Sequence, residues 1–171
     1  PKPGDVKYKD LNNDHKIDQY DVAAIGYPVY PLLTGGINLG FSYKGFDFSM
    51  TWSGATKVSR LLDDIFREPF GATDSRSLMK YMIDDMWTPE KGNSAKAPAI
   101  SFTNKVNNYR DSDLWLRDAS YLRLKNVEIG YNFPKKILSK INIGSLRVFA
   151  TGYNLLTLDK LKIVDPESRP N

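Results

Sequence analysis

The sequence predicts an all-β protein, organised as an antiparallel segment of a transmembrane β-barrel whose long loops contain short helices. Three observations favour this fold class. Residues 35–53 alternate between large apolar and small polar side chains, and the run from Ser112 to Tyr131 joins a polar stretch, an aromatic collar and an alternating strand. The expected turns at one end of these strands are short, whereas the excursions at the other end are long and polar.

The hairpin expected at residues 35–53 has its turn at Lys44-Gly45. One face carries only apolar side chains, namely Ile37, Leu39, Phe41, Tyr43, Phe46, Phe48, Met50 and Trp52. The opposite face is small and mostly neutral, which suits lipid on one side and water on the other. A β-sandwich hairpin with one buried face has the same periodicity and is the alternative.

Residues 1–34 are expected to form an ordered polar loop. Six residues follow the spacing of an EF-hand calcium loop, with Lys16 contributing its carbonyl: Asp10, Asn12, Asp14, Lys16, Asp18 and Asp21. His15 replaces the usual glycine of such a loop, and an aspartate stands at its last position instead of glutamate. The alternative is an Asx-rich turn whose carboxylates accept backbone amides without metal. Either arrangement orders the loop and performs no catalysis.

Residues 54–114 form a long excursion, and its length indicates a function. Within it we expect a helix, capped by Asp74 or Ser75 and ended by Trp87-Thr88-Pro89. Its apolar face would carry Leu78, Met79, Met82, Ile83 and Met86. Trp87 and Tyr109 are the candidate aromatic contacts for a substrate or a covering partner.

A second strand pair is expected within residues 115–158, followed by a loop at 159–171. The first strand, 121–133, places Val127 and Ile129 on its apolar face. The second strand, 146–156, mixes apolar and polar residues in both parities, so its facing is open and a bulge would explain the mixture. Between the strands, 134–145 predicts a short turn with a helical piece. Three aromatic residues are expected at the membrane interface, namely Trp52, Trp115 and Tyr121.

Composition limits the function classes. The 171 residues carry 24 basic and 20 acidic side chains spread along the chain, which is not the basic stripe of a nucleic-acid-binding protein. There is no cysteine, so no disulfide, zinc knuckle or cysteine nucleophile is available. The one histidine, His15, lies in the polar loop, and the carboxylate pairs at Asp63-Asp64 and Asp84-Asp85 are typical of solvated loops. We therefore expect no enzymatic activity.

Ordered blocks of this sequence resemble the C-terminal part of the SusC/RagA-type TonB-dependent outer-membrane transporters. The blocks are GDVKYKDLNNDHKID, GGINLGFSYKGFDFSMTWSG, DDMWTP, DLWLRDASYLRLKNVEIGYNFPKKI and LRVFATGYNLLTL followed by DPE. They span nearly the whole chain in the expected order, which makes them far more specific together than singly.

The resemblance implies the last part of a large outer-membrane barrel that imports oligosaccharides or peptides. It also implies a SusD-like surface lipoprotein as partner, and a TonB complex that acts through a plug region outside these residues. We accordingly expect these residues to come from a longer polypeptide in contact with outer-membrane lipid, and no cofactor is required beyond a candidate calcium ion. A secreted, calcium-stabilised β-sandwich module that binds glycans is the alternative function.

Overall fold

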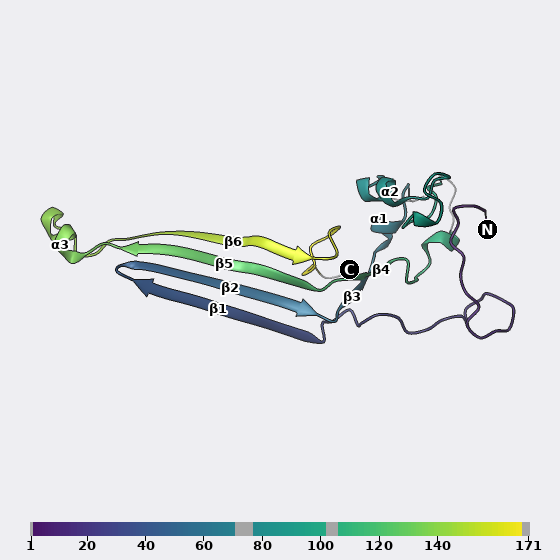
Figure 1. Ribbon diagram of the computed structural model, residues 1–171, viewed down its shortest axis with the longest axis horizontal. Helices are drawn as coiled ribbons and strands as arrows, with labels where there is room; N and C mark the ends of the chain where they lie inside the picture. The colour runs from purple at the N-terminus through teal and green to yellow at the C-terminus, as the bar shows by residue number, and fades with distance from the viewer. Residues whose placement is uncertain (1, 71–76, 102–105, 169–171) are drawn as a thin grey trace. The chain divides into compact units, whose positions relative to one another are not determined.

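The computed structural model describes residues 2–70, 77–101 and 106–168 (Figure 1). The chain divides into two compact units. The first contains residues 1–29, 59–117 and 168–171, and the second contains 30–58 and 118–167. The predicted caps Asp74 and Ser75 lie outside the described residues.

The second unit is a four-stranded antiparallel sheet in the order β1-β2-β5-β6. Its strands are β1 (Leu33–Tyr43), β2 (Phe46–Thr56), β5 (Tyr121–Asn132) and β6 (Arg147–Asp159). The turn from β1 to β2 has only Lys44 and Gly45, with φ of 48° and 92°. Positive φ at both residues matches the right-handed twist of the flanking strands, and glycine adopts it without steric cost. The predicted hairpin is therefore present, with strands slightly longer than 35–53.

The register places the apolar residues of neighbouring strands on one face. Ile37 lies opposite Trp52 on β2, and Phe48 lies opposite Ile129 on β5. The rings of Phe46 and Tyr131 continue this face, with centroids 4.5 Å apart. The parity predicted for residues 126–133 is therefore confirmed.

A bulge at Lys125 exchanges the parity of β5. Thr51 pairs with Asn126 but Trp52 pairs with Leu124, so β5 contains one extra residue. Even-numbered residues of β5 before the bulge thus share a face with odd-numbered residues after it. The bulge keeps Leu124 on the apolar face and Arg123 on the polar face.

The same irregularity settles the facing of β6. Val148 and Ala150 pair with apolar-face residues of β5, and Leu156 pairs with Leu124. Residues 154 and 155 are skipped in the register, and Asn154 has a φ of 52°. The strand looked ambiguous in sequence because it carries this irregularity and because Phe149 and Tyr153 lie on the polar side. β5 and β6 are joined by α3 (Lys135–Leu138) and the 3₁₀ helix η3 (Ser139–Ile141), which confirms the helical piece in that turn.

The first unit consists of short elements. They are the paired strands β3 (Ser59–Leu61) and β4 (Leu116–Asp118), the helices α1 (Asp64–Arg67) and α2 (Lys80–Asp85), and the 3₁₀ helices η1 (Gly92–Ser94) and η2 (Val106–Tyr109). The predicted helix is therefore present as α2 but shorter, because Leu78, Met79 and Met86 lie outside it. Only Met82 of this helix is buried. No helix in the described part of the chain is long and apolar enough to cross a membrane.

Candidate functional site

The polar face of the sheet carries an ion cluster at the end where the short turns lie. The guanidinium of Arg147 donates to Asp47 and to Glu128, each at 2.5 Å, and so joins β6 to β2 and β5. Gly130 lies beneath this contact, since a Cβ there would stand 2.5 Å from Asp47 Oδ2 and 2.6 Å from Arg147 Nη2. The glycine is thus required by the close approach of the charged groups.

A second cluster binds residues 160–167, which we call the return segment, to the polar face at the opposite strand ends. Arg123 is only 5% exposed and donates to Thr157 at 2.9 Å, Glu167 at 2.6 Å and Asp165 at 2.8 Å. Glu167 also accepts from Lys125, the bulge residue, at 2.6 Å. The hydrogen bond from Arg123 holds the pKa of Asp165 below its ordinary value. Two charged side chains of β5, Arg123 and the bulge residue Lys125, therefore fasten the return segment.

Tyr121 belongs to this polar cluster. Its hydroxyl donates to Glu167 at 2.9 Å, and Arg123 lies 5.8 Å from its ring centroid. Trp52 lies on the apolar face instead, opposite Ile37. The two aromatic residues predicted for a membrane interface thus occupy opposite faces of the sheet, and the interface role stays a prediction for both.

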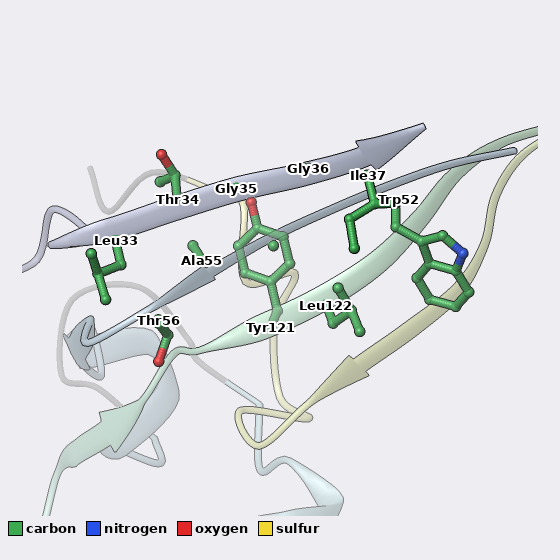
Figure 2. A pocket seen from close by; sticks show the side chains of 11 residues that line it. Leu33, Thr34, Gly35, Gly36, Ile37, Trp52, Ala55, Thr56, Tyr121 and Leu122 are labelled. Atoms are coloured by element: carbon green, nitrogen blue, oxygen red, sulfur yellow. The ribbon is translucent and has the colours of Figure 1, made fainter. Parts of the chain in front are cut away.

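The sheet has a hollow of about 470 Å³ at the strand ends remote from the Lys44-Gly45 turn, and residues of both faces line it, among them Leu122 and Tyr121 (Figure 2). Gly35 and Gly54 are directly paired across β1 and β2, and neither has a side chain to fill the space. Leu33, Ile37 and Leu122 line the same hollow.

The core of the first unit is organised around Asn108, whose side chain is almost fully buried. Its Oδ1 accepts the Val6 amide at 2.9 Å, and its Nδ2 donates to Asp5 at 3.2 Å. Its backbone carbonyl accepts the indole N–H of Trp115 at 3.0 Å. The N-terminal residues are thereby hydrogen-bonded to η2, about a hundred positions later in the chain.

Trp115 and Tyr109 are packed inside this unit, with 2% and 8% of their surface exposed. Their ring centroids lie 6.2 Å apart, and burial raises the pKa of Tyr109. Together with Met82, the two rings line a cavity that is too small for a ligand. The structure therefore gives both aromatic residues a packing position. A substrate contact for Tyr109 and an interface position for Trp115 stay predictions.

Trp87 is half-buried, and its backbone N–H donates to the carbonyl of Ala97 at 2.9 Å. Gly4, with a φ of 88°, lies against its ring, since a Cβ on Gly4 would stand 2.8 Å from the indole. Trp87 thus combines an anchored backbone with partial solvent exposure of the residue as a whole. It is the predicted contact residue that the structure leaves best placed to touch another molecule.

Three carboxylates of the excursion form ion pairs with arginine. Asp64 and Asp111 both contact Arg67, at 2.7 Å and 2.6 Å, and Asp63 contacts Arg60 at 3.2 Å. Burial works against the charge of Arg67, but its two carboxylate partners outweigh it and its pKa is raised. These pairings give the acidic residues a structural role and leave them poorly suited to general acid–base chemistry.

In the Asp-rich loop the carboxylates accept backbone amides. Asp10 accepts from Asn13 at 2.6 Å and from His15 at 2.8 Å, and Asp21 accepts from Leu11 and Asp18. The amides of Asp18 and Leu11 hold the pKa of Asp21 below its ordinary value. The side chains of Asn12, Asp14 and Asp18 likewise accept amides of the loop, whereas the side chain of Lys16 is exposed.

His15 has a φ of 65°, the left-handed conformation that this loop position demands. Within the described residues, no group of three or more acidic or histidine side chains is arranged to hold a metal ion. The structure therefore displays the Asx turns but does not assemble the calcium ligands. Calcium binding stays a prediction of the sequence.

Sequence reasoning missed Arg123, Asn108 and Arg147, each of which makes polar contacts with residues distant in sequence. The sequence did carry a signal for Arg123, because it is a basic residue in the alternating strand β5, where a charged side chain needs a polar partner. Asn108 had no such signal, because its partners Val6 and Asp5 lie about a hundred positions away.

Comparison with known proteins identifies related chains. The sequence is 30% identical over 167 residues to TonB-dependent receptor P3 of Formosa agariphila, covering 97% of this chain and 16% of that protein. It is 27% identical over 168 residues to the TonB-dependent receptor SusC of Bacteroides thetaiotaomicron, again covering 97% and 16%. No family profile matches the chain. The chain thus spans about one sixth of the length of the curated relatives it matches.

Solved structures of the RagAB peptide importer share the fold. The open-open state aligns with a TM-score of 0.67 and 26% identity, and the closed-closed state with 0.68 and 25%. Each alignment covers 89% of this chain and 16% of the matched chain. The antiparallel sheet and the short elements therefore correspond to one part of a much longer receptor.

Proposed function

From the premise that this chain is a member of the SusC/RagA-type TonB-dependent receptors, which reside in the bacterial outer membrane and are not enzymes, we propose that its sheet forms part of a barrel wall. The observation that carries the proposal is the division of the sheet into two faces. The apolar face is solvent-exposed at Ile37 (61%) and Phe41 (63%), whereas the other face carries the Arg147 and Arg123 clusters. Lipid would cover the first face and the aqueous lumen would lie along the second.

The free edges of the sheet support this arrangement. Among the described residues, β1 pairs only with β2, and β6 pairs only with β5. An unpaired strand edge in a bilayer leaves backbone groups without hydrogen bonds, and closing the barrel satisfies them. The alternative sandwich module is disfavoured, because a second sheet large enough to cover the apolar face is not found in the described residues.

The complete receptor is proposed to import oligosaccharides or peptides together with a SusD-like lipoprotein. RagAB is a peptide importer, and the likeness of this chain to its structures supports a related transport role. Residues 54–114 would face the cell exterior, where Trp87 and Tyr109 are the candidate contacts for substrate or lipoprotein. A TonB complex would supply energy through a plug region of the receptor.

The test uses the full-length receptor in its native outer membrane. We expect a lipoprotein to co-purify with the tagged receptor in mild detergent, and we expect labelled peptide or oligosaccharide to enter cells only while the proton-motive force is intact. Trp87→Ala should reduce uptake, whereas Lys135→Ala, in the short turn at the opposite strand ends, should not. Receptor amount in the outer membrane is the control for folding. Uptake that survives deletion of the receptor gene would refute the transport proposal.

We propose that the Asx turns of the Asp-rich loop order residues 10–21 without requiring metal. Asp21→Ala removes the acceptor of two backbone amides and should speed proteolysis within residues 10–21, both in calcium and in a chelator. Protection of the wild-type loop that depends on calcium would instead favour the EF-hand-like prediction.

A further inference from the structure

Three hydrogen-bond donors of β5 converge on one carboxylate of the return segment. Glu167 accepts from the Tyr121 hydroxyl at 2.9 Å, from Arg123 Nη1 at 2.6 Å and from Lys125 Nζ at 2.6 Å. Arg123 is nearly buried, and the Glu167 side chain is 25% exposed. Hydrogen bonds between charged groups are roughly twice as strong as neutral ones, and this carboxylate receives two of them. The strand therefore presents a carboxylate-binding site, which the chain itself fills.

The sheet holds this site in place without help from its occupant. The Nε of Arg123 donates to the Thr157 hydroxyl on β6 at 2.9 Å, which fixes the guanidinium against the neighbouring strand. The two terminal nitrogens of the guanidinium remain for the return segment, since Nη1 contacts Glu167 and Nη2 contacts Asp165 at 2.8 Å. A guanidinium positioned in this way offers two donors to a carboxylate whether or not the return segment is bound.

The occupant belongs to a segment that is attached to the sheet through side chains. Within the described residues, no hydrogen bond between backbone groups joins residues 160–167 to a strand, and the one from Ile163 to the Leu161 carbonyl is local. The beginning of the segment is fixed, because Leu161 is 2% exposed and Lys160 donates to Asp118 at 2.9 Å. The return segment is thus anchored where it leaves β6 and is latched farther on by ion pairs.

Charge balance couples release of the return segment to the arrival of an anion. The two cations of β5 and the two carboxylates of the return segment carry no net charge together. Release without a replacement leaves the nearly buried Arg123 uncompensated, which is strongly unfavourable. A carboxylate from another molecule removes that penalty, so its binding favours the released state. The Asp165 side chain is 53% exposed, which gives such a molecule access to the cluster.

We infer that Tyr121, Arg123 and Lys125 bind a carboxylate group of the transported substrate, which displaces Glu167 and opens the return segment. The role in transport rests on the proposed function, which makes the polar face the wall of the aqueous lumen. The substrate class is acidic, since a peptide with glutamate or aspartate side chains and an oligosaccharide with uronate groups present the same carboxylate. Glu167 acts as an internal competitor that a neutral substrate does not displace.

The test is calorimetric titration of the full-length receptor in detergent, at one ionic strength. The probes are tri-glutamate and tri-glutamine, both acetylated and amidated, together with tri-galacturonate and neutral maltotriose. Each acidic probe that binds should do so at least about tenfold more tightly than its neutral counterpart. Glu167→Gln weakens the internal competitor and should tighten acidic binding about tenfold, whereas Lys125→Gln should weaken it about fivefold. Glu128→Gln is the matched control, because this carboxylate of β5 pairs with Arg147 instead, and should change the affinity by less than about twofold.

In the unmodified receptor, a saturating acidic probe should also speed trypsin cleavage after Lys162, because the bound probe keeps the return segment released. Unchanged cleavage at saturation would overturn the displacement. Equal affinity for acidic and neutral probes in Glu167→Gln would overturn the carboxylate site. Where that variant fails to accumulate, Lys125→Gln decides, since undiminished acidic binding refutes the site.

The two acidic probes distinguish the source of the carboxylate. Tighter binding of tri-glutamate alone supports the site and assigns it to acidic peptides, and tighter binding of tri-galacturonate alone assigns it to acidic oligosaccharides. None of these measurements requires uptake into cells. Failure of the transport proposal and failure of the carboxylate site are therefore distinct results.

Discussion

Replacing Arg123 with alanine should release the return segment, residues 160–167, from the polar face of the sheet. Arg123 is 5% exposed, and its guanidinium hydrogen-bonds Thr157, Asp165 and Glu167 at once. The variant leaves Glu167 with Lys125 and Tyr121 as partners, but leaves Asp165 without its guanidinium. The segment therefore keeps part of its attachment and opens more often.

The magnitude follows from the exposure of each partner. Hydrogen bonds to charged groups contribute about 1.5–3 kcal/mol each. The Glu167 side chain is only 25% exposed, so its pair with Arg123 contributes most of this free energy. The Asp165 side chain is 53% exposed, so its pair with Arg123 contributes at most about 1 kcal/mol. The sum is about 3 kcal/mol of opening free energy, which corresponds to roughly a hundredfold larger open population.

The fraction of molecules with the segment released can be measured by trypsin digestion, because trypsin cleaves after lysine and the segment contains Lys160 and Lys162. When opening is fast compared with cleavage, the cleavage rate follows the open population, so peptides ending at these lysines should form about a hundred times faster. Arg147→Ala is the matched control, since it removes an arginine with two carboxylate partners from the other end of the same face. A change of less than threefold in Arg123→Ala, or an equal change in the control, would show that Arg123 does not hold the segment.

Three other predictions concern single sites. Gly130→Ala should break the ion pair between Arg147 and Asp47, because the added methyl group would collide with both side chains. The sheet should lose about 1–3 kcal/mol of stability, measured as a shift in the denaturation midpoint of the full-length receptor. An unchanged midpoint would show that the two side chains do not approach Gly130 this closely. Asn108→Ala should leave the buried Val6 amide without its acceptor, at a cost of about 2 kcal/mol. Amide hydrogen exchange at the N-terminal residues should accelerate accordingly. Unaltered exchange would show that Asn108 does not hold these residues in place. Hydrogen bonds from Ser120 and Lys160 lower the pKa of Asp118 to about 2. Because a depressed carboxylate pKa stabilises the folded state above the unfolded pKa, this stabilisation should be lost as pH falls from about 4 to 2, and Asp118→Asn should remove that component of the acid titration.

Local pattern determined much of this chain. Alternation alone predicted the β1-β2 hairpin, its Lys44-Gly45 turn and its two chemically distinct faces, because residues two apart share a face of any strand. The same reasoning predicted the apolar parity of residues 127–131. The resemblance of ordered blocks to a receptor family then supplied the membrane context that periodicity leaves open.

Only the tertiary structure decided what depends on partners far away in sequence. The bulge at Lys125 is defined by the register against β2, so the parity of β5 and β6 could not be followed past it from either strand alone. Arg123 acquires its role from Glu167, and Asn108 from Val6, at separations that composition and spacing do not encode. Periodicity reports the environment of a residue's own segment, whereas a hydrogen-bond partner or a hollow between strands exists only once distant segments are paired.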